Sequence, residues 1–310
     1  MTVTAKHFLD ISATESAGLD SILQSAHAMK QARAGQPQGF VEPDRPLENR
    51  ILAMIFEKPS TRTRVSFDVA MRQMGGQSLL LTGSDLQLGR GETVADTARV
   101  LSRFVDAIMI RTFEAEKLAE LAEYATVPVI NGLTDLTHPC QVMADIMTLQ
   151  EKKGDVSKLK IAWSGDSNNV TNSWMHAAAH FGFELHIASP EPLQPASDML
   201  DWCRTNSANV AVTEDPDAAA DGADCVMADV WLSIHEEGEG TKHNLLKPYQ
   251  VDETLMSKAK DDAVFMHCLP AHRGEEVTAG VIDGPQSIVF DEAENRLHVQ
   301  KAILAWCLDN

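Results

Sequence analysis

The sequence RILAMIFEKPSTRTRVSF, residues 50–67, joins an apolar run to a dense group of hydroxyl and guanidinium side chains. The apolar run predicts a buried β-strand that stops before Pro59. Apolar residues resume at Val65 with the spacing of a helix. The segment therefore predicts a strand-to-helix turn whose residues 60–64 are all hydrogen-bond donors.

Similar apolar runs alternate with helical patterns along the rest of the chain. They are DAIMIR (106–111), VPVING (127–132), KLKIAWSG (158–165), ELHIAS (184–189), NVAVTED (209–215), DCVMADV (224–230), AVFMHCL (263–269) and SIVFDEA (287–293). Strands that alternate with helices over 310 residues predict an α/β chain of two domains, each a mostly parallel sheet flanked by helices.

The domain boundary is expected near residue 150, where a helix running from Pro139 to about Lys152 ends at Gly154. We therefore expect one domain over 1–150 and a second over 151–296. A last helix over 297–310 is expected to pack back on the first domain.

The composition excludes several classes of partner. Lys and Arg total 26 against 45 for Asp and Glu, a formal net charge of −19, which argues against nucleic acid and against an anionic membrane surface. The five cysteines are odd in number and form no CxxC pair, as expected in a reducing compartment. No apolar run approaches the roughly 18 residues of a membrane span, and the first residues lack a signal peptide's apolar stretch. These features predict a cytoplasmic protein.

Reactive side chains follow one predicted strand after another. They are Ser60–Arg64, Arg111, His138 with Gln141, the segment SGDSNN (164–169), Asp229, and His267-Cys268-Leu269-Pro270. Because ligands of open α/β sheets bind outside the carboxyl ends of the strands, this distribution predicts a single shared cleft.

The turn at residues 60–64 has the chemistry of an anion site. Ser60 or Thr61 can cap the following helix, whose first amides and positive dipole end attract an anion. Thr63 adds a hydroxyl donor and Arg62 a bidentate fork suited to phosphate, whereas Arg64 is expected to point elsewhere. The alternative is a well-capped surface helix with solvated arginines. No GxxxxGK precedes the turn, which disfavours a nucleoside triphosphate.

Three further residues have both a structural and a functional interpretation. Arg111 can pair with Glu114 or Glu116, or it can face the cleft and bind phosphate. His138 can close the helix that begins at Pro139, or it can donate to a developing oxyanion. Gln141 can donate to and accept from an amide-like group.

The segment SGDSNNV (164–170) stands where a dinucleotide-binding turn would carry GxGxxG. Ser167 and Val170 replace its second and third glycines, so no nicotinamide cofactor is expected. Asn168 or Asn169 can cap the next helix or bind a polar amino acid.

No metal or other cofactor is expected from the remaining motifs. His176 and His180 lack the glutamate of a zinc protease and are expected on a packed helix face. Cys268 and His272 have no partnered cluster near them in the sequence. Cys268 is either an inert buried thiol or a thiol that faces the cleft.

Taken together, these motifs resemble the aspartate/ornithine carbamoyltransferase family, and within it the ornithine carbamoyltransferases most closely. The resemblance covers nearly the whole chain. It rests on STRTRVSFDVA (60–70), HPCQVMADIMTLQ (138–150), GDSNN (165–169), DVWLS (229–233), HCLPAHRGEEV (267–277) and DEAENR (291–296). Cys268 in HCLP, where the aspartate and acetylornithine enzymes have HPLP, and Asp229 in DVW favour a cationic diamino acid as acceptor.

The resemblance implies transfer of a carbamoyl group from carbamoyl phosphate to the side-chain amine of L-ornithine, giving L-citrulline and phosphate, without cofactor or covalent intermediate. It also implies a homotrimer or a multiple of it and a place in arginine biosynthesis. The alternatives are another amine acceptor, putrescine or N-substituted ornithine, or a non-catalytic relative.

Site residues carry over from the family by motif. Catalysis would fall to Arg111, His138, Asp229 and Cys268. Carbamoyl phosphate would be bound by Ser60, Thr61, Arg62, Thr63, Gln87, Arg111, His138, Gln141, Cys268, Leu269 and Arg296. Ornithine would be bound by Asn169, Asp229, Ser233 and Ile234. Gln87 corresponds to a residue that the family lends to a neighbouring subunit.

One departure from the family concerns the segment after DVW. The family usually reads DVWxSMG, whereas this chain has Ile234 and His235 in place of the methionine and glycine. Histidine resists conformations that glycine permits, so the affinity for the amino acid is expected to depend on this change.

Overall fold

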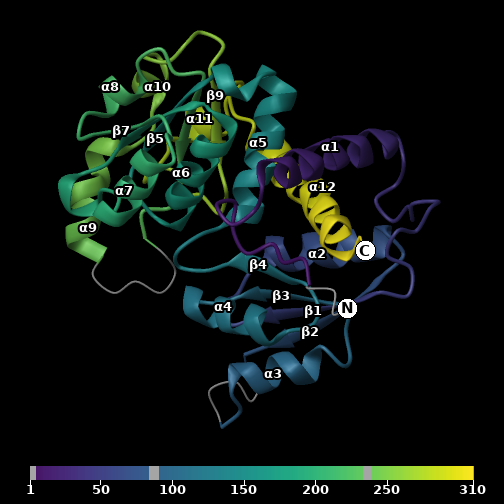
Figure 1. The fold of residues 1–310 in the computed structure, drawn as a ribbon. Helices are drawn as coiled ribbons and strands as arrows, with labels where there is room; N and C mark the ends of the chain where they lie inside the picture. Colours follow the sequence, from purple (N-terminus) through teal and green to yellow (C-terminus); the bar gives the residue numbers. More distant parts are fainter. Residues whose placement is uncertain (1–4, 84–90, 233–238, 310) are drawn as a thin grey trace. The chain divides into compact units, whose positions relative to one another are not determined.

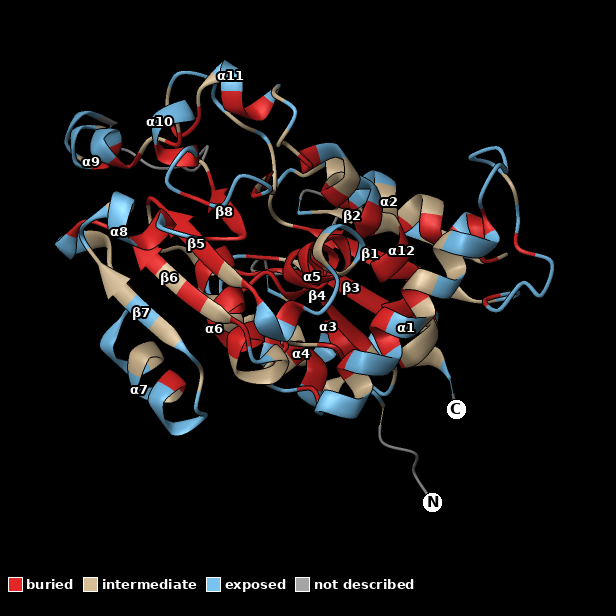
Figure 2. Ribbon diagram, turned by 90° about the horizontal axis from the view of Figure 1, so that it is seen from above, coloured by how far each residue is buried: buried red, intermediate tan, exposed pale blue. Residues whose placement is uncertain are grey.

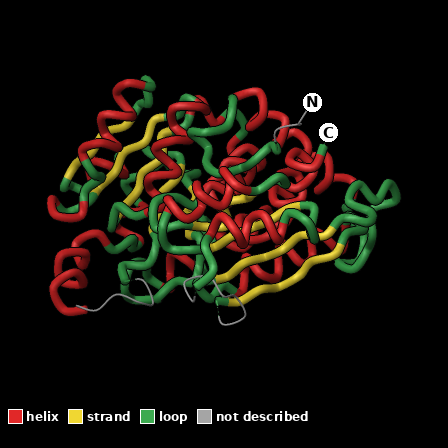
Figure 3. The backbone as a smooth tube through the Cα atoms, turned by 60° about the horizontal axis from the view of Figure 1, so that its bottom comes forward, coloured by secondary structure: helices red, strands yellow, loops and turns green. Residues whose placement is uncertain are grey.

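The computed structural model describes residues 5–83, 91–232 and 239–309. Contacts divide the chain into two compact units, Met1–Met147 with Asn295–Asn310, and Thr148–Glu294. Each unit is an α/β body in which helices and strands alternate along the chain, as the sequence predicts (Figures 1 and 3). Gln87, Ser233 and Ile234, which were assigned to substrates by resemblance, lie outside the described residues.

The first unit is built on a four-stranded parallel sheet of order β2-β1-β3-β4. Its elements are α1 (Ser16–Ala32), β1 (Ile51–Phe56), α2 (Thr61–Gln73), β2 (Gln77–Thr82), α3 (Val94–Leu101), β3 (Ala107–Arg111), α4 (Ala115–Tyr124), β4 (Val129–Leu133), the start of α5 (Pro139–Lys153) and the end of α12 (Val289–Leu308).

Helices cover both faces of this sheet. Figure 1 shows α3 and α4 on one side and α2 and α12 on the other. The α3–α4 side buries a continuous apolar cluster that includes Ala53, Ile55, Ile108, Leu121 and Val129. The two central strands, β1 and β3, are buried on both faces, which explains their nearly unbroken apolar sequences (Figure 2).

The second unit holds a five-stranded parallel sheet of order β7-β6-β5-β8-β9. Its elements are η1 (Val156–Lys158), β5 (Lys160–Ser164), α6 (Asn169–Phe181), β6 (Glu184–Ala188), η2 (Glu191–Leu193), α7 (Ser197–Thr205), β7 (Val210–Thr213), α8 (Pro216–Ala220), β8 (Cys225–Ala228), α9 (Glu239–Leu246), η3 (Lys247–Tyr249), α10 (Glu253–Met256), β9 (Val264–His267) and α11 (Ala279–Ile282).

The core of this unit includes a cluster that joins the sheet to α8, α10 and α11. Val226 and Phe265 from the strands pack there with Leu255, Met256 and Val281 from the helices. Within the described residues, no helix is both long and apolar enough to cross a bilayer.

Three sequence predictions about elements need correction. Strand β2 was not foreseen; it lies at the sheet edge, where its side chains are exposed or half-buried and its apolar signal is weak. SIVFDEA (287–293) is not a strand, because helix α12 already begins at Val289. The last helix therefore starts eight residues before the expected Leu297, and its residues from Asn295 belong to the first unit as expected.

Both sheets place their switch points where the reactive side chains occur. In the first sheet the chain runs outward from β1 to β2 on one side and to β3 and β4 on the other, so the switch lies between β1 and β3. In the second sheet it lies between β5 and β8. Switch points at the carboxyl ends of strands are the usual ligand sites of such sheets.

Candidate functional site

Ser60, between β1 and α2, is the N-cap of α2. Its extended backbone (φ −160°) lets its hydroxyl accept a hydrogen bond from the backbone N–H of Thr63, at 3.3 Å. This settles which of the two candidate residues caps the helix. Thr61 is exposed, Arg62 half-buried and Thr63 buried. The helix N-terminus, with its unsatisfied amides and positive dipole end, therefore coincides with the hydroxyl and guanidinium groups.

Arg111, the last residue of β3, lies beside this turn. It pairs in register with Phe56 at the end of β1, and the backbone N–H of Glu57 donates to its carbonyl at 2.9 Å. Glu114, which the sequence offered as a partner for Arg111, forms an ion pair with Lys117 at 3.0 Å. Parallel pairing of β1 and β3 thus brings Arg111 to the same edge of the sheet as the α2 N-terminus.

His138 precedes α5 and is buried, with 5% of its surface exposed. Burial, followed by the nearby guanidinium groups of Arg296, Arg111 and Arg62, holds the pKa of His138 well below its usual value. The imidazole is therefore neutral near pH 7. Positive charges from α12, β3 and α2 therefore all act on this ring electrostatically.

Arg296 of α12 connects this group through buried hydrogen bonds. Its Nη2 donates to the Thr63 hydroxyl at 2.7 Å, and its Nη1 donates to the side-chain oxygen of Gln141. Gln141 in turn donates to the carboxylate of Asp145 at 2.8 Å. Gln141 therefore orients Arg296. Its expected contact with a carbamoyl amide stays a prediction.

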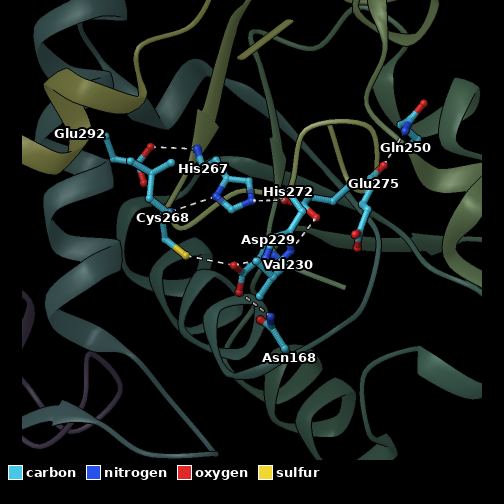
Figure 4. A network of polar contacts seen from close by, with 11 residues as sticks. Asn168, Asp229, Val230, Gln250, His267, Cys268, His272, Glu275 and Glu292 are labelled. Carbon is cyan, nitrogen blue, oxygen red and sulfur yellow. Dashed lines mark hydrogen bonds and ion pairs between the residues drawn. The ribbon is translucent and has the colours of Figure 1, made fainter. Parts of the chain in front are cut away.

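The second unit gathers a separate polar cluster around Asp229, which follows β8 (Figure 4). The side-chain amide of Asn168 donates to Asp229 Oδ2 at 2.7 Å. The thiol of Cys268 and the backbone N–H of Val230 donate to Oδ1, at 3.1 and 2.8 Å. Cys268 is half-buried rather than sealed in the core. Asp229 is thus a mostly buried carboxylate (9% exposed), held by groups from the ends of β5, β8 and β9.

The bend after β9 is held by His267. Its Nδ1 accepts from the backbone N–H of Leu269 at 2.9 Å, and its own backbone N–H donates to Glu292 at 3.0 Å. Leu269 has a positive φ of 58°, and its peptide bond to Pro270 is cis. The chain turns sharply at this point, which exposes Leu269 and Cys268 partly instead of burying them as strand residues.

Asn168 is the residue that the sequence prediction undervalued. It is the N-cap of α6, and its side-chain oxygen accepts from the backbone N–H groups of Val170 and Thr171. Its amide nitrogen donates to Asp229 at the same time. Asn169, the residue carried over for ornithine, is the first residue of α6. The N-cap signal was present in the sequence, but the contact across 61 residues was not.

Two metal-related expectations meet different outcomes. His176 is buried and packs edge-on against Trp202, with ring centroids 4.4 Å apart, which confirms the packed helix face for this residue, whereas His180 is half-buried. The expectation that Cys268 and His272 lack clustered partners is wrong. Cys268 groups with Asp229 and His267, and His272 groups with Glu275 and Glu276, in each case within 4.8 Å.

The two groups of site residues lie in different units. The group around His138 belongs to the first unit and the group around Asp229 to the second. Their meeting in one cleft stays a prediction.

Comparison with known proteins agrees with these sites. Residues 6–151 match the carbamoyl-phosphate-binding domain of aspartate/ornithine carbamoyltransferases, and residues 157–307 match the Asp/Orn-binding domain. The chain is 58% identical over 304 residues to an ornithine carbamoyltransferase of Roseobacter denitrificans, covering 97% of this chain and 99% of the relative. It is 59% identical over 309 residues to one from Bradyrhizobium diazoefficiens, covering 100% and 99%.

Solved structures give the same result. The ornithine carbamoyltransferase of Pyrococcus furiosus superposes with a TM-score of 0.91 at 47% identity, covering 98% of this chain and 97% of that one. The anabolic enzyme of Campylobacter jejuni superposes with a TM-score of 0.89 at 38% identity, covering 97% and 98%. With a matching fold, both matching domains and relatives of this identity, the chain belongs to the aspartate/ornithine carbamoyltransferase family.

Proposed function

We propose that this chain is an enzyme that transfers the carbamoyl group of carbamoyl phosphate to the side-chain amine of L-ornithine, giving L-citrulline and phosphate. One observation carries the proposal: three arginines lie near the N-terminus of α2. Arg62 is in its first turn, Arg111 ends the neighbouring strand β3, and Arg296 donates to the Thr63 hydroxyl at 2.7 Å. A chain with a net charge of −19 repels small anions, so a local group of cations is needed to bind one. The names of the relatives supply the identity of the anion and of the acceptor.

Carbamoyl phosphate is assigned to the first unit. Ser60, Thr61, Arg62 and Thr63, together with Arg111, hold its phosphate, through the first amides of α2, the hydroxyl groups and the two guanidinium forks. Dianionic phosphate offers several acceptor oxygens, which matches this excess of donors.

The carbonyl oxygen of the donor is assigned to Arg111, His138 and Thr63. Because the Thr63 oxygen accepts from Arg296, its hydroxyl proton is directed to a second acceptor. Because the pKa of His138 is lowered, the ring donates as a neutral imidazole and adds no further charge to the guanidinium groups. Such preorganised donors stabilise the oxyanion of a tetrahedral intermediate.

The amide of the carbamoyl group is assigned to Gln141 and to the backbone carbonyl of Leu269. Arg296 closes this pocket and Cys268 lies beside the reacting amine. Gln87 is proposed to reach the site of a neighbouring subunit.

Ornithine is assigned to the second unit, through Asn169, Asp229, Ser233 and Ile234. The Asp229 carboxylate suits a cationic amino acid because opposite charges within hydrogen-bond distance attract strongly in a mostly buried site. Asn168, Cys268 and the backbone of Val230 fix the orientation of that carboxylate.

The chemistry consists of one addition and one elimination. The ornithine side-chain ammonium, with a free pKa of about 10.4, first loses a proton to solvent, and the neutral amine then adds to the carbamoyl carbon. The attacking nitrogen passes its second proton to the leaving phosphate oxygen. The tetrahedral oxyanion then collapses, and the C–O bond to phosphate breaks. Phosphate leaves with the electron pair into the donors that already hold it. Positioning of the two substrates for attack on the carbamoyl carbon supplies up to about 7–11 kcal/mol of the barrier reduction.

The wider setting is proposed from the family. The first unit serves as carbamoyl phosphate domain and the second as ornithine domain. The chain assembles as a homotrimer or a multiple of it, acts in the cytoplasm and takes part in arginine biosynthesis.

The proposal is tested by measuring product with carbamoyl phosphate and one acceptor at a time: ornithine, putrescine, acetylornithine and aspartate. Turnover with ornithine is expected to exceed turnover with the others. Turnover with only a different acceptor would refute ornithine as the acceptor but would not affect the assignment of carbamoyl phosphate to the first unit. An Arg111→Ala variant is the control for enzyme-dependent product, because it removes a residue from the proposed donor site.

A further inference from the structure

The loop after the Cys268–Leu269 bend carries a second group of metal-ligating side chains, outside the residues assigned to the substrates. One ligand atom each of His272, Glu275 and Glu276 lies within 4.8 Å of the other two. Figure 4 shows His272 and Glu275 in this loop, together with Gln250, which anchors it.

Glu276 gives the group its significance, because its side chain is fully buried. Its Oε1 accepts from the backbone N–H of His272 and lies 3.4 Å from His267 Nε2. Its Oε2 has no hydrogen-bond partner among the described residues and lies 3.8 Å from His272 Nδ1. A buried carboxylate oxygen without a donor is costly, and it points to a cation as its partner.

The spacing suits a tetrahedral transition metal. With zinc–nitrogen and zinc–oxygen bonds of about 2.1 Å, adjacent ligand atoms of a tetrahedron lie roughly 3.4 Å apart. The 3.8 Å between His272 Nδ1 and Glu276 Oε2 needs only a small contraction to reach that value. An imidazole in the set disfavours Mg²⁺ and Ca²⁺, which prefer oxygen ligands alone.

The surroundings keep the group accessible and negatively charged. The side chain of His272 is 48% exposed, so an ion can enter from solvent. Arg273, between the ligands in sequence, is bound by Asp283 through two hydrogen bonds of 2.8 and 2.6 Å and is held there. Gln250 donates to the carbonyls of Gly274 and Glu275, at 2.8 and 2.6 Å, which fixes the loop backbone.

We propose that His272, Glu275 and Glu276 bind a Zn²⁺ ion through Nδ1, a carboxylate oxygen and Oε2, with water as the fourth ligand. His243 Nε2 lies 4.0 Å from the Glu275 carboxylate, outside hydrogen-bond distance, and is not counted among the ligands. The ion joins the start of the loop to its end and so stabilises the second unit. It takes no part in carbamoyl transfer.

The test must separate this site from the other group, Asp229, His267 and Cys268, which also offers metal ligands. Zn²⁺ binding is therefore measured by calorimetry on the full chain carrying Cys268→Ser. His272→Ala and Glu275→Gln are then added singly to that background. Arg273→Ala is the matched control, because Arg273 lies in the same loop and is exposed but is not a ligand.

In the Cys268→Ser chain we expect one Zn²⁺ per chain and a higher thermal midpoint with Zn²⁺ than without it. His272→Ala and Glu275→Gln should each weaken binding about tenfold or more, since even residues behind the ligands cost 10–100-fold. Arg273→Ala should bind as its parent does. Loss of all binding with Cys268→Ser alone, or unchanged affinity after His272→Ala, would overturn the proposal.

Discussion

The small side chain of Thr63 has two roles in the proposed mechanism. Its buried hydroxyl accepts from Arg296 at 2.7 Å and is assigned to donate to the carbonyl oxygen of carbamoyl phosphate. Thr63→Val keeps the shape of the side chain and removes both interactions. The substitution therefore has two consequences of different size, one on folding and one on turnover.

The folding consequence follows from Arg296, which is 3% exposed. Its Nη2 loses an acceptor, and hydrogen bonds to charged groups are worth about 1.5–3 kcal/mol. The unfolding free energy of Thr63→Val should fall by an amount in that range, read from urea unfolding. The catalytic consequence is larger. Removal of one oxyanion donor typically costs about 2.7–4 kcal/mol, so kcat should fall roughly 100–1,000-fold.

Kinetic and calorimetric assays decide between these roles. If the hydroxyl acts mainly in the transition state, kcat and kcat/KM should fall together while the affinity for carbamoyl phosphate changes little. Thr97→Val is the matched control, because the Thr97 hydroxyl in α3 is buried without a hydrogen-bond partner among the described residues. It should leave turnover unchanged and should not lower the unfolding free energy, because no hydrogen bond among the described residues is lost. A folded Thr63→Val chain that keeps nearly full kcat would refute the oxyanion role.

Three further predictions concern single residues. Arg62→Ala should lower the affinity for carbamoyl phosphate by roughly 10–100-fold in calorimetry. Arg64→Ala, at an exposed position, should leave that affinity unchanged. Equal losses of affinity in the two variants would contradict the assignment of the phosphate to Arg62. Asn168→Ser keeps a capping side chain but loses the amide donor to Asp229, so the KM for ornithine should rise at nearly constant stability. Asn168→Ala should raise the KM and also lose about 1 kcal/mol of unfolding free energy, because the cap is removed. An unchanged KM in both variants would exclude a role of Asn168 in orienting Asp229 for ornithine. The pKa of His138 is lowered in the folded chain, so near and below the usual histidine pKa the unfolded chain binds more protons, and the unfolding free energy decreases as the pH is lowered. His138→Gln should reduce this decrease in urea unfolding between pH 7 and pH 5, and an identical dependence on pH would contradict the prediction.

The parts of the fold that the sequence predicted are those with one-dimensional signals. Strands β1 and β3 are buried on both faces, so their sequences are unbroken apolar runs. Strand β2 lacks that signal because it is an edge strand. The segment at Val289 has β-branched and aromatic residues and was taken for a strand. Asp291 and Glu292 in the first turn of α12 carried the opposite signal, since acidic residues favour a helix start.

The site was predictable to the extent that it follows from local sequence. The N-cap and hydroxyl groups around Ser60 are readable from five adjacent residues. The hydrogen bond between Arg296 and Thr63 joins positions 233 residues apart, and no periodicity in the sequence reports it. The resemblance placed both residues in the site, but it did not show that one orients the other. The cluster of His272 with two glutamates was missed because its short spacing within a loop fits no common metal motif.

The arginines around His138 give a strongly acidic chain a local positive site, but their like charges also repel one another. The guanidinium groups of Arg62, Arg111 and Arg296 all act on His138 with like charge, and the lowered pKa of His138 prevents a fourth positive charge. Like charges near one another are expected to repel. A dianion bound among them removes that repulsion, so part of its binding free energy appears as stability. Mass action gives about 2.7 kcal/mol when the ligand is present at 100 times its Kd. The first unit therefore gains stability from the anion that it binds. Because the rest of the chain is acidic and repels anions, the anion binds preferentially at this group of arginines.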